Sequence, residues 1–204
     1  MRDFELITNP DGSILVRYND GRMLSVDDDA DGPAYDFAVN YLGLLSVNYR
    51  SHLYAADLLL KRQYTASEYR DLRADTRKYN LRLALQSMHC CFGAIDNIPD
   101  CDSMGNLNVE FVQCPLRATC PYNGYKHRDT RMACCNPIYE TNLTRRQAEV
   151  ADLLVNTSYN TDDIATALCT SGNNVRHLAS VIYATFGVAN RQELTLLLKN
   201  KRLV

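Results

Sequence analysis

Seven of the eight cysteines lie in one stretch of the sequence, and their thiols are the side chains best placed to do chemistry. The stretch runs from Cys90 to Cys135. Structural zinc sites take four thiolate or imidazole ligands, generally from two chain segments that the metal brings together. The spacing predicts one ligand from the pair after His89 and the others from the segment 114–135. The expected ligands are Cys91, Cys114, Cys120 and Cys135.

Other ligands and other chemistry stay open for these cysteines. Cys90, Cys101 and Cys134 are substitute ligands, since the adjacent pairs leave spare sulfur. Four thiolates also hold iron–sulfur clusters, which would make the protein a redox or oxygen sensor. Free or disulfide-exchanging thiols are the third alternative. The eighth cysteine, Cys169, is expected to be a small core residue of a short helix.

A cysteine nucleophile would make the chain an enzyme. Cys91 follows two residues after His89, which could act as its base. A nucleophile and its base must meet in space, however, and adjacency in the sequence does not show this. We therefore expect no enzymatic activity.

Two regularly patterned parts flank the cysteine-rich stretch, and the first combines strands and helices. Short β-prone runs at 4–7, 13–18 and 22–26 are separated by turns containing Asp-Gly, which predicts an antiparallel meander. The three-or-four spacing of apolar residues predicts helices over 33–62 and 66–89. We expect these helices to form a long antiparallel hairpin. Their apolar faces either pack on each other or contribute to a dimer interface.

The second regular part begins at Leu143 and has the pattern of a helix-turn-helix. Its spacing predicts a helix over 145–155, a short helix from Thr161, and a third helix capped by Ser171 and stopped by Gly187. The outer face of the third helix carries short or forked hydrogen-bonding side chains, at Asn173, Asn174, Arg176, His177 and Ser180. A tight turn followed by a helix with polar groups near its start is the arrangement of a DNA-recognition helix.

The sequence from Leu143 onward also matches a known pattern at many correctly spaced positions. These are Leu143 to Val150, Ile164-Ala165, Leu168, Ser171, Val175-Arg176, Ile182-Tyr183, Gly187-Val188 and Asn190 to Leu194. Together they resemble the DNA-binding domain of LuxR/GerE-type transcriptional regulators. The resemblance implies a four-helix module that binds double-stranded DNA as a homodimer, with its third helix in the major groove, and that can contact RNA polymerase.

Individual DNA contacts follow as hypotheses. Arg176 is the best candidate for a bidentate contact to guanine or for a phosphate contact, and Asn174 could read adenine. The residues expected to contact backbone phosphates are Arg145, Arg146 and Arg191. For Arg191 an internal salt bridge to Glu149 or Glu193 is the alternative. Asn173, His177 and Ser180 are weaker candidates for base contacts.

Charge and hydropathy restrict the class of protein. The formal net charge of the chain is -2, and residues 143–204 carry 7 Lys+Arg against 5 Asp+Glu. This modest basic excess argues against binding through phosphate neutralisation alone. No apolar run approaches the roughly 20 residues of a bilayer-spanning helix, and the start has no export signal. We expect a cytoplasmic, nucleoid-associated bacterial protein.

The expected fold is mainly α with a small N-terminal antiparallel β meander, a helical hairpin and a C-terminal four-helix LuxR-type helix-turn-helix domain. Three parts follow: 1–88 for sensing or dimerisation, 89–142 as a metal-binding connector, and 143–204 for DNA binding. The expected function is a sequence-specific transcriptional regulator. The alternative is a redox- or metal-sensing protein whose helix-turn-helix binds DNA non-specifically or binds a protein.

Overall fold

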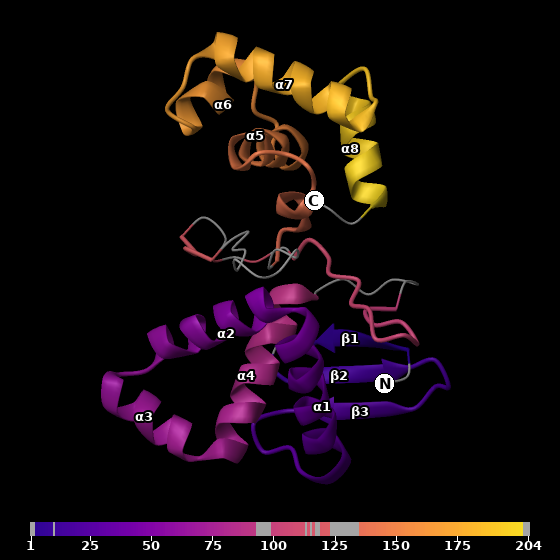
Figure 1. The fold of residues 1–204 in the computed structure, drawn as a ribbon, viewed down its shortest axis with the longest axis vertical. Coiled ribbons are helices and arrows are strands. Elements are labelled where there is room, and N and C mark those ends of the chain that lie inside the picture. Colours follow the sequence, from indigo (N-terminus) through magenta and orange to yellow (C-terminus); the bar gives the residue numbers. More distant parts are fainter. Residues whose placement is uncertain are drawn as a thin grey trace. The chain divides into compact units, whose positions relative to one another are not determined.

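The computed structural model describes residues 3–9, 11–92, 99–112, 114, 116, 119–122 and 135–201. The chain divides into two compact units, Met1–Cys135 and Asn136–Val204. The boundary between the units therefore falls inside the expected connector 89–142. Most of the described chain is helical, with one small sheet in the N-terminal unit (Figure 1).

The N-terminal sheet is the predicted meander. It consists of β1 (Phe4–Thr8), β2 (Ile14–Tyr18) and β3 (Met23–Val26), paired antiparallel in the order β1-β2-β3. The two hairpin turns contain Gly12 and Gly21, whose φ angles of 88° and 82° are readily adopted only without a Cβ atom. Alternate residues of the strands point into the core, which is why these short runs read as half-buried strands.

Four helices follow the sheet where two long ones were predicted. They are α1 (Gly32–Asn48), α2 (Arg50–Gln63), α3 (Ala66–Ala74) and α4 (Thr76–Cys91). The predicted two-helix hairpin is therefore wrong, since each long helix breaks once. One break is at Tyr49, whose buried hydroxyl accepts a hydrogen bond from the Leu107 backbone N–H at 2.8 Å. The other is at Asp75, whose carboxylate caps α4 by accepting from the Lys78 N–H.

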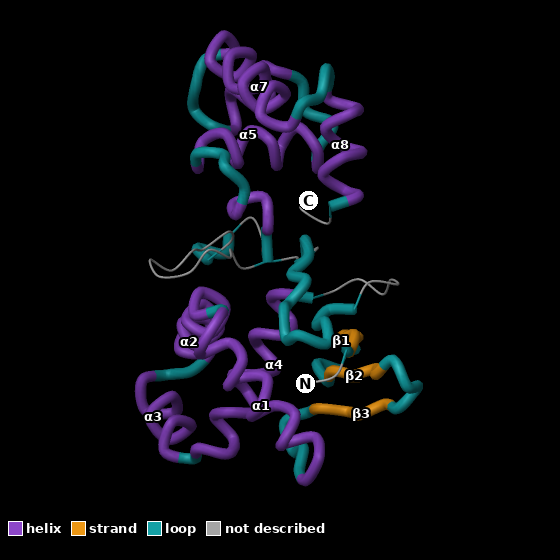
Figure 2. The backbone as a smooth tube through the Cα atoms, turned by 45° about the vertical axis from the view of Figure 1, so that its right-hand side comes forward, coloured by secondary structure: helices purple, strands orange, loops and turns teal. Residues whose placement is uncertain are grey.

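The core of the N-terminal unit forms between the sheet and the helices. α4 packs against both α1 and α2, and α1 also contacts β3. The Phe4 and Phe37 rings meet edge to face with their centroids 5.1 Å apart, joining β1 to α1. The smooth trace in Figure 2 shows the helices gathered beside the three strands. No helix in the described part of the chain is long and apolar enough to cross a membrane.

The C-terminal unit is a set of short helices around a separate core. A 3-10 helix, η1 (Pro137–Glu140), precedes α5 (Arg145–Asn156), α6 (Thr161–Ala167), α7 (Gly172–Phe186) and α8 (Arg191–Asn200). The predicted helix limits are confirmed within one residue, including the start of α6 and the stop at Gly187, whose φ is 66°. Ser171 caps α7 as predicted by accepting from the Asn174 N–H. Because capping depends on neighbouring residues alone, the sequence contained this information.

Removal of one core side chain tests the packing of the C-terminal unit. Ile182 is fully buried on α7, so Ile182→Ala leaves a cavity and is expected to lower the free energy of unfolding by about 2–5 kcal/mol. Chemical denaturation followed by circular dichroism measures this change. Ser180→Ala, on the exposed side of the same helix, is the control and should stay within about 0.5 kcal/mol. Equal effects of the two substitutions would contradict the observed orientation of α7.

Candidate nucleic-acid interface and cysteine cluster

Helix α7 has one buried face and one exposed polar face. Val175 and Ile182 lie in the core of the unit, where α7 packs against α5, α6 and α8. The exposed face carries the five side chains that the sequence suggested for base reading: Asn173, Asn174, Arg176, His177 and Ser180. The structure therefore brings all five predicted residues to one accessible helix surface.

Hydrogen bonds orient the polar groups at the start of α7. The Arg176 guanidinium donates to the Asn173 side-chain oxygen at 2.7 Å, which steadies a long side chain and uses only part of its N–H donors. The Asn174 amide donates to the Thr170 hydroxyl at 2.9 Å. The Ser180 hydroxyl donates to the Arg176 carbonyl at 3.0 Å, so it is engaged with its own helix. Arg176 and Asn174 thus have the best-defined orientation on this face.

The first turns of α6 and α7 approach each other closely at a glycine that the sequence analysis passed over. A Cβ atom built on Gly172 would lie 2.9 Å from a carboxylate oxygen of Asp162. The absence of a side chain at Gly172 is what permits this approach. It leaves the Asp162 carboxylate beside the N-terminal turn of α7, where the positive end of the helix dipole favours a negative charge. A glycine directly after the capping serine was the available signal for such a close contact.

Arg191 is held inside the C-terminal unit. Its guanidinium donates to the carbonyl oxygens of Leu154, Thr157 and Tyr159, the last at 2.6 Å. These carbonyls belong to the end of α5 and the connection to α6, where helix geometry leaves carbonyl groups without intrahelical partners. The contact is internal, as the alternative held, but its partners are carbonyls rather than Glu149 or Glu193. The geometry gives Arg191 a positioning role inside the unit, and its predicted phosphate contact stays a prediction.

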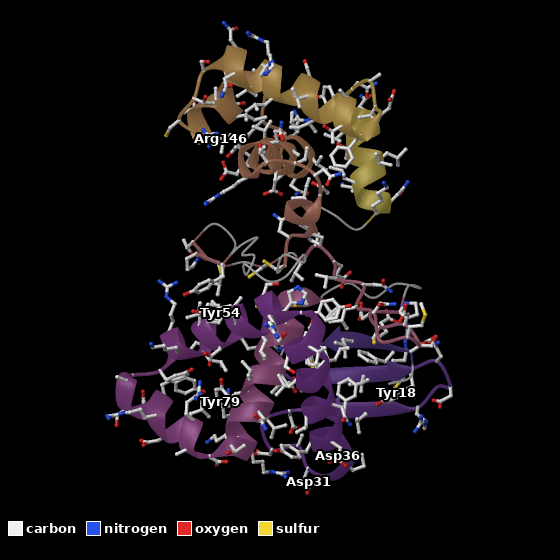
Figure 3. All side chains as sticks on the ribbon, in the orientation of Figure 1. Tyr18, Asp31, Asp36, Tyr54, Tyr79 and Arg146 are labelled. Atoms are coloured by element: carbon white, nitrogen blue, oxygen red, sulfur yellow. The ribbon has the colours of Figure 1, made fainter. Side chains whose placement is uncertain are left out.

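Arg146 has a similar internal role at the other end of α6. It donates to the Glu149 carboxylate at 2.9 Å and to the carbonyl oxygen of Leu168, the residue that ends α6. Figure 3 labels Arg146 on α5, close to α6. Arg145 differs from both, because its side chain is 88% exposed and makes a surface pair with Glu149 at 3.2 Å. Such pairs contribute little to stability, so Arg145 stays suited to a phosphate contact.

Among the cysteines, Cys90 and Cys91 differ in burial, since Cys91 lies in the core and Cys90 packs at its edge. Cys91 is fully buried in the apolar core of the N-terminal unit. It continues the buried stripe of α4 that includes Leu81, Ala84 and Met88, a three-or-four spacing that was readable in the sequence. Cys90 is half-buried, and its sulfur accepts a hydrogen bond from the Gln86 amide at 3.3 Å. Cys90 is therefore the more accessible of the two thiols, and the prediction of Cys91 as a metal ligand stays a prediction.

The Cys90 thiol lies in the same neighbourhood as three other predicted ligands. Its pKa is raised to about 12, chiefly by burial and in smaller part by the negative charge that Cys135, Cys114 and Cys120 would carry as thiolates. Backbone hydrogen bonds from Glu110 to Cys91 and from Val112 to Cys135 bring the chain segments of these cysteines together in the N-terminal unit. Within the ranges that the structure describes, no three His, Cys, Asp or Glu side chains form a ready-made metal site.

Cys101 and Cys169 lie apart from these residues. Cys101 is buried where its backbone bridges Phe4 of β1, and burial raises the pKa of its thiol to about 11. Cys134 lies outside the described residues. Cys169 is exposed with a φ of 50°, in the turn between α6 and α7, so the prediction of a core position for it is wrong. Its left-handed backbone ends α6 in the way that helix ends often do.

The histidine considered as a catalytic base is engaged away from the core. One ring nitrogen of His89 shares a hydrogen bond with the carbonyl oxygen of Gly12, at 3.0 Å, in the first hairpin turn. The Cys91 thiol, by contrast, is within the apolar core. This arrangement provides no support for a Cys91–His89 nucleophile and base.

The internal role of Arg191 can be tested by its effect on stability. Arg191→Ala removes three hydrogen bonds to carbonyl oxygens and is expected to lower the free energy of unfolding by about 1.5–3 kcal/mol, the scale of a hydrogen bond to a charged group. Arg145→Ala is the matched control and should change stability by less than about 0.5 kcal/mol. Thermal unfolding of both variants is the measurement. An Arg191→Ala variant as stable as the wild type would exclude the positioning role.

Comparisons with known proteins identify no relative of this chain. No family model, no curated protein and no solved structure matches it. The geometry and chemistry of its own residues are therefore the basis for proposing what the protein does.

Proposed function

We propose that this protein is a sequence-specific, DNA-binding transcriptional regulator of the LuxR/GerE type, which reads the major groove with α7. The observation that carries the proposal is the division of α7 into a buried apolar face and an exposed face bearing all five candidate reading residues. The major groove admits an α-helix and presents a distinct donor and acceptor pattern for each base pair. Helix α7 can therefore enter the groove, and its exposed polar side chains can bond to the base edges there.

Arg176 and Asn174 are the proposed base-reading side chains. The planar guanidinium of Arg176 can donate two parallel hydrogen bonds to O6 and N7 of guanine. Its bond to Asn173 restrains the side chain before DNA arrives, which reduces the entropy lost on binding. The Asn174 amide can donate to N7 and accept from N6 of adenine once it exchanges its partner Thr170 for the base.

Backbone contacts would come from fewer arginines than the sequence suggested. Arg145 is exposed at the start of α5, whereas the Asp162 carboxylate already lies beside the first turn of α7 and makes that turn less suited to a phosphate. Residues 143–204 carry only 7 Lys+Arg against 5 Asp+Glu, so the non-specific electrostatic attraction to DNA is modest. Under the proposal, base contacts therefore distinguish the specific site from other DNA.

The homodimer and the contact with RNA polymerase belong to the same proposal. A protein with two-fold symmetry reads two half-sites arranged as an inverted repeat, with the recognition helices about one DNA turn apart. In this scheme the N-terminal unit supplies the regulatory part of the protein. No catalytic step is required of either unit.

A selection experiment tests the proposal. The purified full chain is mixed with sheared genomic DNA of its host, the bound fragments are sequenced, and the recovered site is used to measure affinity. Recovery of one motif, arranged as an inverted repeat, is the expected result. Recovery of random fragments with a steep salt dependence would instead favour the alternative of a sensor with non-specific DNA binding.

The Arg176→Ala substitution tests the reading residue on the recovered site. The loss of a bidentate contact is expected to weaken binding by about 1–3 kcal/mol, roughly 5- to 150-fold, and to relax the preference at one base position. Lys199→Ala is the matched control, since it removes the same charge from the last turn of α8. Fluorescence anisotropy at one fixed salt concentration measures both variants. Equal losses for the two would mean that α7 is not the reading element.

A further inference from the structure

Backbone hydrogen bonds tie separate parts of the cysteine-rich stretch together. The Glu110 N–H donates to the Cys91 carbonyl oxygen at 3.2 Å, which joins the segment around Glu110 to the end of α4. Two residues later, the Val112 N–H donates to the Cys135 carbonyl oxygen at 3.3 Å, and the Cys114 N–H turns back to the Val112 carbonyl at 2.8 Å. The end of α4, the segment around Cys114 and the residue Cys135 are therefore neighbours.

A fourth segment reaches the same part of the unit through Cys120. The Cys120 N–H donates to the Leu116 carbonyl oxygen at 2.8 Å, closing one turn of chain. Two residues further on, the Arg62 guanidinium lies over the Tyr122 ring, 6.0 Å from its centroid, in a cation–π contact with the last turn of α2. Because α2 packs along α4, this contact holds Cys120 on the side of the unit where Cys90 lies.

The long connection after α4 needs an additional source of stability. Its described residues form two isolated β-bridges and no helix or regular strand before η1. A connection of this length in a compact unit is generally held by a ligand, a crosslink or a metal ion. Cys135 also adopts a left-handed φ of 43°, which for a residue with a side chain requires support from its surroundings.

We infer that the thiols of Cys90, Cys114, Cys120 and Cys135 bind one zinc ion that fastens this connection to the end of α4. Four cysteine thiolates are a standard ligand set for structural zinc, and each of these residues comes from a different tethered segment. The set differs from the one that spacing suggested. Cys91 is fully buried in the core, whereas its neighbour Cys90 lies at the edge of the core, where Gln86 contacts its sulfur and also Gln63 at the end of α2. The inference is independent of DNA binding, since all four residues lie in the N-terminal unit.

Zinc binding would draw the four segments together. The described side chains do not form a ready-made site, so the sulfur atoms have to approach one another as the metal enters. Each thiol gives up its proton to the solvent and becomes a thiolate ligand, and the binding free energy then contributes to folding. The soft sulfur donors favour zinc over magnesium or calcium, which prefer oxygen ligands.

The metal content of two variants, with substitutions at the adjacent residues Cys90 and Cys91, tests the ligand set. The wild-type chain, purified without added metal, is expected to contain one zinc ion per chain and, after exchange, to show the visible absorption of tetrahedral cobalt(II) with four thiolates. Cys90→Ser should lose both signals, whereas Cys91→Ala should keep both. The opposite pattern, a wild-type chain without bound metal, or iron in place of zinc would each overturn the inference.

A labelling experiment gives the same answer without substitutions. The wild-type protein is alkylated with iodoacetamide before and after treatment with a zinc chelator, and each cysteine is read by mass spectrometry. Cys90, Cys114, Cys120 and Cys135 should be protected until zinc is removed. The exposed Cys169 is the internal control and should react in both samples. Reaction of the four thiols at the rate of Cys169 before chelation would exclude a shared metal.

Discussion

The C-terminal unit depends most on the contact between the Arg191 guanidinium and three backbone carbonyls at the end of α5. The last carbonyl groups of a helix have no donor within the helix and need one from elsewhere. A guanidinium group is planar and charged, and it can donate to several carbonyls at once. The contact fixes the connection that leads into α6. Arg146 does the same where α6 ends, through the Leu168 carbonyl. Helix α6 is thereby held at both ends, and α7 packs directly against it.

This use of arginine has a consequence for DNA recognition. Two of the cations that sequence reasoning assigned to phosphates, Arg146 and Arg191, also stabilise turns inside the unit. In the proposed mode of binding, Arg176 and Asn174 supply the base contacts and Arg145 supplies a phosphate contact. The same distinction between internal and external roles separates Cys91 from Cys90 in the other unit. Consecutive residues of a helix point about 100° apart, so one can complete a core while the next faces a cysteine-rich loop.

The features that could be predicted from the sequence are those that depend on local interactions. The three strands, the Ser171 cap and the stop at Gly187 depend on neighbouring residues, and their positions were predicted closely. The breaks at Tyr49 and Asp75 were missed, the first because it depends on Leu107, far along the chain. The internal partners of Arg191 could not be predicted, because backbone carbonyls have no sequence signature. The exposure of Cys169 was missed for a different reason, since this residue follows the end of α6 in a left-handed turn and its side chain points away from the core.

The central claim is that the outer face of α7 lies in the major groove of a specific site. A photocrosslinking amino acid in place of His177, on that face, tests it most directly, with the same group in place of Lys199 on α8 as the comparison. The full chain is irradiated on its selected DNA site, and the crosslinked nucleotide is mapped by sequencing. Our account predicts an efficient crosslink from position 177 to bases within the half-site and at most a weak one from position 199. Efficient crosslinking from position 199 together with none from position 177 would contradict it.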